Sequence, residues 1–473
     1  MLWPGRPGAW VSTLQGQPQD GQAPRVHRST TPVPLRYTAA MASDIETGLV
    51  DAQSPAGQRR RELPELSDWL KALRCVSAIA LHGSSIRAAQ AIHLSQPAVA
   101  RSILELERHL GHALFDRGAR GMAATAMGLR LAARAGRVQE QLALGAAEAQ
   151  ALSVPAPRRA PTPERFASAV APGSLKALLV VASQASESRA ALVLGVSQPA
   201  VHRSLRVLED ACGATLYAKS PRGTRLTESG EAMLRRVKLA MAELRAAEAD
   251  IAAARGQVQG RIVVGALPLS VHLVLPQAVA AVRRQHPQIR ITVVDGTYES
   301  LIHQLRHADV DLVVGALRPQ AAPELAQQLL FREDLAIVAR PGHPCLQGDA
   351  PALADLLQWP WVVPLPFTPA RAALERAFAQ HGLPPPHDGL QATSAQFTRT
   401  LVAGTDHLAL ASRWQAEEDA AAGLLALLPL TLEGSMREIG LALRAGSEPS
   451  PDLQALVEAL RQQTPKETRG TRS

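Results

Sequence analysis

The sequence predicts a mixed fold: two related, mostly helical units that each end in a long helix, followed by a domain in which strands alternate with helices. Three observations predict it. The pentapeptide SQPAV occurs at Ser95–Val99 and again at Ser197–Val201, 102 positions later. A proline-rich segment separates the two copies. After Gly260, short β-branched runs replace the helical spacing of apolar residues.

The match around the two pentapeptides continues in both directions without a gap. Residues 95–128 lie over 197–230, with roughly 15 of 34 positions identical, and residues 84–94 lie over 186–196. A unit of about 60 residues is therefore duplicated.

The charge balance favours an anionic partner. The 473 residues carry a net charge of +8, which attracts nucleic acid, although a solvated basic surface accounts for it equally well. No apolar run reaches the length of a membrane span and the N-terminus lacks a signal-peptide core, so we expect no membrane contact and a cytoplasmic protein. The cysteines, Cys75, Cys212 and Cys345, are too far apart for a metal clip and are expected to be free thiols.

The chain divides into predicted segments whose bounds follow from composition and apolar spacing. They are a disordered arm (1–62), a first unit (63–128), its long helix (129–152), a proline-rich linker (153–172), a second unit (173–230), its long helix (231–256), an α/β domain (260–465) and a charged tail (466–473). Met1 and Met41 are both candidate starts, because the residues before Met41 resemble a leader.

Strand-like runs alternate with helical segments in the α/β domain. The runs cover 260–267, 289–296, 309–317 and 333–342, and a helix is expected over 273–287. Because strands that alternate with helices are joined by crossovers, we expect a parallel sheet.

The duplicated pentapeptide begins an amphipathic helix. Ser197 suits an N-cap, and Pro199 falls in the first turn, where a missing N–H costs nothing. One face is apolar in each copy, with Val201, Leu205, Leu208 and Cys212 in the second and Val99, Ile103, Leu106 and Leu110 in the first. The other face carries Gln198, His202, Arg203 and Arg206, matched in the first copy by Gln96, Ala100 and Arg101.

The residues around this helix predict a helix-turn-helix with a wing. A short helix with paired alanines precedes it, at Arg87–Ala89 and Arg189–Ala191. A basic glycine turn follows, at Arg120–Gly121 and Arg222–Gly223, between strand-like pieces whose arginines reach phosphates in a wing. A two-helix hairpin with a solvated polar face is the plainer alternative.

The pattern AA…SQPAV…LE…G..L[FY]…RG…T..G resembles the DNA-binding domain of LysR-type transcriptional regulators, and the resemblance covers roughly 66–465. It implies two winged helix-turn-helix units with recognition helices Ser95–Glu107 and Ser197–Glu209, double-stranded DNA as partner, a homodimer or homotetramer, and contact with RNA polymerase. The implied DNA-binding residues are Ser197, Gln198, Pro199, His202, Arg203, Arg206, Arg222, Arg225, Ser95, Gln96, Pro97, Arg101 and Arg120.

The chain departs from that family in two ways. The family has one such unit per chain, and a serine usually follows the pentapeptide where this chain has Ala100 and His202. The second copy, with a polar side chain there and Arg225 in its wing, is predicted to be the stronger DNA reader. The first copy is then weaker, differently specific or a pairing surface.

The resemblance also implies a C-terminal effector domain of two α/β lobes, like a periplasmic binding protein, with a small-molecule cleft between them. The second lobe is expected to begin near 362–375. Ligands in such folds lie beyond the carboxyl ends of strands, which selects Leu269, Ser270, Phe367, Thr368, Thr393 and Ser394, although helix capping explains each of them equally well. The segments DLVVGALR and ARPGHP resemble the galactose-binding-protein-regulator branch, which hints at a sugar or a small organic acid.

No catalytic pattern is present: the sequence lacks HExxH, GxSxG and a phosphate-binding glycine loop, so neither an enzyme nor a cofactor or metal is predicted. Two alternatives remain: a ligand sensor acting through protein contacts with degenerate DNA units, and an enzyme on the α/β domain.

The two long helices are expected to pair with each other within one chain, and pairing across two chains is the alternative.

Overall fold

The structure, a computed structural model, describes residues 64–118, 121–153, 160–220, 223–267, 274–320, 322–387 and 389–464. The predicted arm over 1–62 and tail over 466–473 lie outside these residues. None of the described helices alone is long and apolar enough to cross a membrane; one bent pair, Pro163–Ala169 with Pro172–Gln184, meets the length and composition criteria together.

The first unit has the predicted helix-turn-helix, hairpin and long helix. Its elements are η1 (Glu65–Trp69), α2 (Leu70–His82), α3 (Ser85–Ala91), α4 (Gln96–Leu110), β1 (Phe115–Gly118), β2 (Gly121–Ala124) and α5 (Ala126–Ala151). The paired alanines of the short helix α3, Ala88 and Ala89, are buried. The hairpin forms because β1 and β2 pair antiparallel, with Phe115 opposite Ala124.

The second unit repeats the same order of elements. They are α6 (Pro163–Ala169), α7 (Pro172–Gln184), α8 (Glu187–Leu194), α9 (Gln198–Cys212), β3 (Tyr217–Ser220), β4 (Gly223–Leu226) and α10 (Glu228–Ala254). The hairpin has the same register, with Tyr217 opposite Leu226. The recognition helices, predicted over Ser95–Glu107 and Ser197–Glu209, each begin one residue later and extend three residues further.

In each unit, one glutamate side chain joins the recognition helix to the start of the hairpin by the same two hydrogen bonds. The side chain of Glu107 accepts backbone hydrogen bonds from Leu114 and Phe115 at 2.8 and 3.2 Å. Glu209, 102 positions later, accepts from Leu216 and Tyr217 at the same two distances. This contact fixes the start of each hairpin against the end of each recognition helix.

The linker predicted over 153–172 is partly helical, which corrects that prediction. Helix α6 lies inside it because Thr162 Oγ1 accepts from the backbone N–H of Arg165 and Pro163 occupies the first turn. Phe166, 1% exposed, anchors the helix in the core. The long helices also begin three residues earlier than predicted, since Thr125 and Thr227 cap them.

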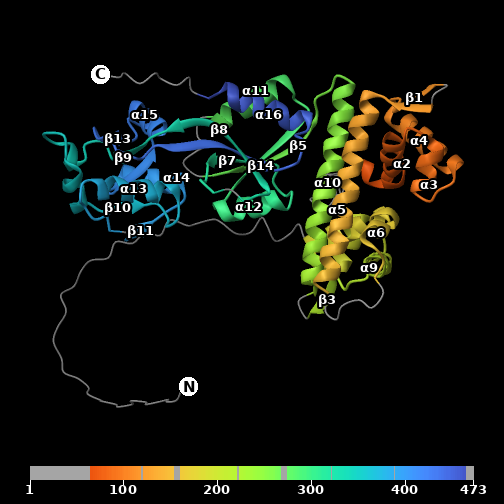
Figure 1. Ribbon diagram of the computed structural model, residues 1–473. Coiled ribbons are helices and arrows are strands. Elements are labelled where there is room, and N and C mark those ends of the chain that lie inside the picture. Colours follow the sequence, from red (N-terminus) through yellow and green to blue (C-terminus); the bar gives the residue numbers. More distant parts are fainter. Residues whose placement is uncertain are drawn as a thin grey trace, which may run out of the picture. The chain divides into compact units, whose positions relative to one another are not determined.

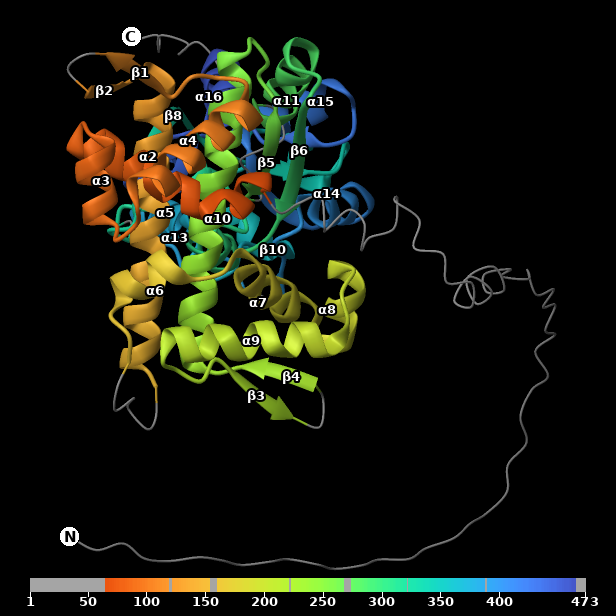
Figure 2. The same cartoon turned by 90° about the vertical axis from the view of Figure 1, so that its right-hand side faces the viewer.

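The two long helices, α5 and α10, pack against each other along their length (Figures 1 and 2). They run antiparallel, because Arg134 near the start of α5 contacts Asp250 near the end of α10, and Glu148 near the end of α5 contacts Arg236 near the start of α10. The core between them is built mainly from Leu, Ala and Val, as an aromatic-poor sequence requires. The pairing within one chain agrees with the arrangement expected from the sequence.

The α/β domain contains two five-stranded sheets with helices on them. The first sheet has the order β6-β5-β7-β14-β8 and the second β11-β10-β12-β9-β13. The strands are β5 (Gly260–Ala266), β6 (Ile289–Asp295), β7 (Leu312–Ala316), β8 (Leu325–Glu333), β9 (Leu335–Ala339), β10 (Trp361–Val363), β11 (Leu390–Gln391), β12 (Leu408–Ser412), β13 (Ala426–Leu427) and β14 (Arg437–Arg444). The helices are α11 (Val274–Gln285), α12 (Tyr298–Arg306), η2 (Pro344–Leu346), η3 (Leu353–Gln358), α13 (Pro369–Gln380), α14 (Ala395–Gly404), α15 (Arg413–Ala421) and α16 (Pro451–Gln462).

Two predictions about this domain were wrong. Both sheets are mixed: β14 returns to the first sheet and pairs antiparallel with β7 and β8, and β9 pairs antiparallel with β12 and β13 in the second. The second lobe begins at β9 and not near 362–375, because the chain crosses between sheets twice, after β8 and before β14. The crossing is held by a buried pair, Arg437 with Glu333, whose carboxylate also accepts from Ser412 Oγ.

Candidate nucleic-acid interface and effector cleft

The predicted contact residues of the second unit lie on one exposed face of α9. Ser197, Gln198, Pro199, Arg203 and Arg206 are exposed and His202 is half-buried. Ser197 occupies the N-cap position, but its side chain makes no capping hydrogen bond, so its expected capping role is not fulfilled. Its hydroxyl therefore remains available on the exposed face.

A carboxylate that the sequence reasoning missed lies beside this face. Glu187, at the start of α8, accepts from Gln198 Nε2 at 3.0 Å and lies 3.3 Å from Nδ1 of His202. Arg206 lies 3.5 Å from Glu209. Arg203 has neither an ion pair nor a hydrogen bond from its guanidinium within the described ranges, so it is the available cation of this helix. The alignment of the two repeats, offset by 102 residues, could have indicated it, because Glu187 occupies the position that Ser85 has in the first unit.

The first unit presents the equivalent face on α4. Ser95, Gln96, Pro97 and Arg101 are exposed. Ser95 Oγ caps the helix by accepting from the backbone N–H of Ala98 at 3.4 Å. Gln96 Nε2 donates to Ser85 Oγ at 3.4 Å, a neutral partner where the second unit has a carboxylate. The Arg101 guanidinium, like that of Arg203, contacts no carboxylate in the part of the chain that the structure describes.

The two wings are less completely described. Arg225 is exposed on β4. Arg120 and Arg222, predicted at the wing tips, lie outside the described residues. The hairpins that carry them are formed and follow directly after each recognition helix.

A cavity of about 160 Å³ lies between the two lobes, beyond the carboxyl ends of β5, β6, β7, β10 and β11. Three of the predicted effector residues line it together: Phe367, Thr368 and Thr393. Ser394 lies next to it and caps α14 by accepting from the backbone N–H of Phe397. Leu269 and Ser270 lie outside the described residues.

An arginine that the sequence reasoning missed reaches across this cavity. Arg318 follows β7, and its backbone is fixed by two hydrogen bonds with the side chain of Gln327, at 3.1 and 2.8 Å. Its guanidinium lies 4.5 Å above the ring of Tyr298 and donates from Nη1 to the carbonyl of Phe367 in the other lobe at 3.0 Å. Its Nε is buried without a hydrogen-bond partner among the described residues.

The aromatic residues of the cavity are held in unusual states. Phe367 has a φ of +62° with its side chain 95% exposed, a backbone conformation that costs about 1–3 kcal/mol in a non-glycine residue. Burial raises the pKa of Tyr298, although the Arg318 guanidinium opposes this shift, so its hydroxyl stays protonated and can donate. Strain of this kind concentrates at ligand sites.

No group of three or more His, Cys, Asp or Glu side chains that could hold a metal occurs among the described residues. The arrangement thus comprises two exposed helix faces, each with an available arginine, and one cleft between lobes with a pre-positioned arginine.

Comparison with protein families gives matches along most of the chain. Residues 255–465 match the family described as "LysR substrate binding domain". The family described as "Bacterial regulatory helix-turn-helix protein, lysR family" matches twice, at 70–129 and at 173–231.

Individual relatives agree with these matches. The "HTH-type transcriptional regulator GalR" of Pseudomonas putida is 35% identical over 407 residues, which cover 85% of this chain and 98% of the relative. An alignment of that length does not fit into the chain after residue 129, so it includes part of the first unit. The "HTH-type transcriptional regulator PcaQ" of Agrobacterium fabrum is 31% identical over 289 residues, covering 61% of this chain and 93% of its own.

Among solved structures, CbnR, titled a LysR family transcriptional regulator, is 21% identical, covers 62% of this chain and 99% of its own, and has a TM-score of 0.47. The helix-turn-helix geometry, the two-sheet domain and the family matches lead to one conclusion. The chain belongs to the LysR family and is a DNA-binding transcriptional regulator with a C-terminal effector-binding domain.

Proposed function

We propose that both recognition helices contact DNA, through Ser95, Gln96, Pro97 and Arg101 of α4 and through Ser197, Gln198, Pro199, His202, Arg203 and Arg206 of α9. The observation that carries this proposal is the exposure of an arginine without a carboxylate partner on each helix. A free guanidinium forms bidentate hydrogen bonds with guanine or pairs with phosphate. The wing arginines Arg120, Arg222 and Arg225 are proposed to contact phosphates.

The effector is proposed to be a small organic acid bound in the cavity between the lobes, in preference to an uncharged sugar. Arg318 supports this choice, because this half-buried arginine has a buried Nε without a hydrogen-bond partner among the described residues, which favours an anionic acceptor. Phe367, Thr368 and Thr393 would surround the remainder of the ligand. Ser394, Leu269 and Ser270 are proposed as further effector contacts.

Ligand binding in the cavity between the lobes changes the angle between the two lobes. Arg318 joins them by its hydrogen bond to the Phe367 carbonyl. An anion that draws the guanidinium toward itself weakens this bond and releases the strained turn at Phe367. The change in lobe angle is the proposed signal to the DNA-binding units.

Three further features complete the proposal. The chain assembles as a homodimer or homotetramer, works in the cytoplasm where the DNA is, and acts on RNA polymerase. Its relatives are named transcriptional regulators, so no reaction is assigned to the α/β domain.

The DNA part is tested by fluorescence anisotropy with the DNA upstream of the chain's own gene. The full chain should bind with an affinity that falls steeply as salt rises, because phosphate contacts release counterions. R203A should weaken binding, whereas R332A, an exposed arginine on β8, should not. Salt-insensitive binding, or none, would instead support a sensor that acts through protein contacts.

The effector part is tested by thermal unfolding with a panel of small mono- and dicarboxylates and neutral monosaccharides. An acid at about 100 times its Kd should stabilise the chain by about 2.7 kcal/mol, and R318A should lose that shift. A shift caused by sugars alone would contradict the choice of an acid.

A further inference from the structure

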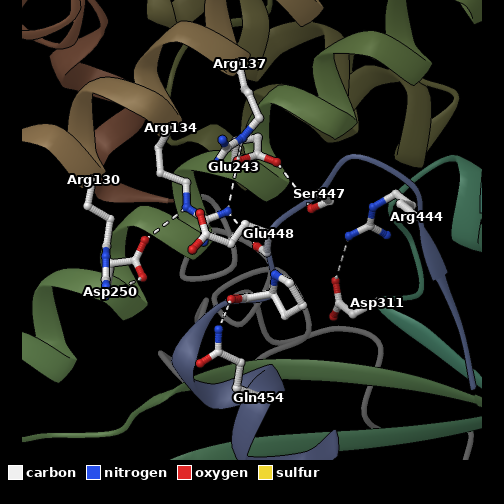
Figure 3. Close-up of polar contacts among 11 residues, drawn as sticks. Arg130, Arg134, Arg137, Glu243, Asp250, Asp311, Arg444, Ser447, Glu448 and Gln454 are labelled. Atoms are coloured by element: carbon white, nitrogen blue, oxygen red, sulfur yellow. Dashed lines mark hydrogen bonds and ion pairs between the residues drawn. The ribbon is translucent and has the colours of Figure 1, made fainter. Parts of the chain in front are cut away.

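The contact between α5 and α10 centres on a buried arginine. Arg134 of α5 donates from Nε to Asp250 at 3.0 Å and from Nη1 to Glu243 at 3.1 Å, and its side chain is 2% exposed. Figure 3 shows these groups, with Arg130 and Arg137 on the same side of α5. A buried arginine with two carboxylate partners fixes the register of the two helices, because removing any partner leaves an uncompensated charge.

The same contact occurs a second time in the same pair. Arg236 of α10 donates from Nε to Glu148 at 3.1 Å and from Nη1 to Gln141 at 3.0 Å. Arg236 is the repeat equivalent of Arg134, since 134 + 102 = 236, and both of its partners follow the same offset. An exchange of the two units therefore maps one set of contacts onto the other, which is the signature of a pseudo-twofold axis between α5 and α10.

The outer ends of the helix pair show the same exchange. Near the end of α5, Gln150 Nε2 donates to the carbonyl of Cys212, the last residue of α9. Just after α10, Arg255 donates to the carbonyl of Leu110, the last residue of α4. Each long helix thus holds the recognition helix of the other unit, so both recognition helices are placed by one rigid helix pair.

We infer that a single chain is a complete two-half-site DNA reader, and that the DNA it reads is asymmetric. The inference rests on the proposed DNA contacts of both units. In two-fold symmetric dimers, the palindrome of the operator mirrors the symmetry of the protein. Here the symmetry relates two different sequences, so the half-sites it selects differ as well.

The two recognition helices differ at the positions that face outward. Exposed Leu104 of α4 stands where α9 has exposed Arg206, and Ala100 stands where α9 has His202. An apolar side chain favours the thymine methyl group, whereas arginine favours guanine. Adjacent half-sites one helical turn apart should therefore carry unlike sequences.

Covalent connection favours this pairing over pairing between chains. The α5 helix ends at Ala151 and α6, the first helix of the second unit, begins at Pro163, so the two units are joined by a short segment. A tethered partner has an effective concentration in the millimolar range, far above the concentration of a second regulator chain. When chains assemble through their effector domains, each added chain brings its own pair of DNA-binding units, and the pairs within the chains stay intact.

A disulfide tests the pairing in the full chain. A Cβ on Gly145 would lie 3.0 Å from the Cβ of Arg236, so cysteines at these positions of α5 and α10 are adjacent. After mild oxidation, the variant G145C/R236C should run as a single chain in non-reducing electrophoresis with two fewer free thiols than when reduced. A covalent dimer, or thiols that stay free in the folded variant, would overturn the inference; G145C and R236C alone are the controls.

Selection from random-sequence DNA tests the asymmetry with the unmodified chain. Enriched sequences should contain two unlike half-sites about one helical turn apart. R203A should reduce the enrichment of one half-site about tenfold, and R101A should reduce that of the other half-site by less. Two half-sites of the same sequence in inverted orientation, or loss of the same half-site in both variants, would overturn the inference but not the proposed DNA contacts. The absence of any enrichment would instead overturn the DNA contacts on which it rests.

Discussion

Arg134 and Arg236 are the same residue of the two repeats, yet their surroundings have diverged. Arg134 also donates from Nη1 to the backbone carbonyl of Glu448, in the loop after β14, at 2.8 Å (Figure 3). Arg236 contacts only α5 within the described residues, and its side chain is 17% exposed against 2% for Arg134. The arginine that contacts the effector domain therefore belongs to the first unit, although the second unit is the one that directly precedes that domain in the sequence.

The largest expected effect comes from removing these two arginines in turn. R134A should lower the free energy of unfolding by about 3 kcal/mol, because Glu243 and Asp250 remain buried and keep, as cationic partners among the described residues, only Arg137 and Arg130. R236A should cost about 1 kcal/mol, since Glu148 is more exposed and keeps Arg235. Urea unfolding of both variants measures the difference, and equal losses would remove the asymmetry described above.

The next effect concerns the two recognition helices. R203A should cost about 1–3 kcal/mol of DNA binding if the guanidinium contacts a base edge. R101A should cost less, because its helix has Ala100 in place of His202. Anisotropy titrations at one salt concentration compare the two variants, and a greater loss for R101A would reverse the ranking.

A third effect depends on pH and on a carboxyl that only the second long helix carries. Glu248 accepts from the backbone N–H of Leu66 at 2.9 Å, whereas its repeat equivalent in α5 is Ala146. Burial raises the pKa of Glu248 to about 7. The folded chain therefore holds this proton more tightly than the unfolded chain.

The stability that Glu248 contributes is full below its unfolded pKa and is lost as the pH rises through about 7. The free energy of unfolding should thus fall less between pH 5 and pH 8 in E248Q than in the unmodified chain. Urea unfolding at a series of pH values measures both slopes, and A146Q is the matched control. If the free energy of unfolding changes with pH by the same slope in E248Q and in the unmodified chain, protonation of Glu248 does not contribute to stability.

The smallest expected effect comes from the carboxylate beside α9. E187S gives the second unit the residue that the first unit has at Ser85, and removes a negative charge next to Gln198 and His202. DNA binding should tighten by less than about 1 kcal/mol at low salt, and the gain should shrink as salt rises. Weaker binding would mean that Glu187 positions these side chains for DNA.

The repeat explains which features were predictable from the sequence. The helix-turn-helix, the hairpins and the long helices follow from local apolar spacing and from caps such as Thr125 and Thr227. Phe367, Thr368 and Thr393, which line the cavity between the lobes, could be selected because strand ends can be placed from the sequence. These features depend on residues that are near each other in the chain.

The features that were missed depend on distant contacts. Helix α6 was predicted as linker because four prolines between 155 and 163 obscured the anchor Phe166. The return of β14 to the first sheet has no local signal, since it is set by pairing with β7 and β8. Arg318 was missed because only the folded chain brings it to Phe367.

The number of chains bound to each DNA duplex shows whether one chain supplies both recognition helices of a pair. Native mass spectrometry would use the full chain with an excess of a short duplex that holds one selected pair of adjacent half-sites. If one chain carries both recognition helices of a pair, the complexes contain one chain for each duplex, whether or not effector domains join two such complexes. Two chains for each duplex would contradict the account, because each chain would then supply only one recognition helix to the pair.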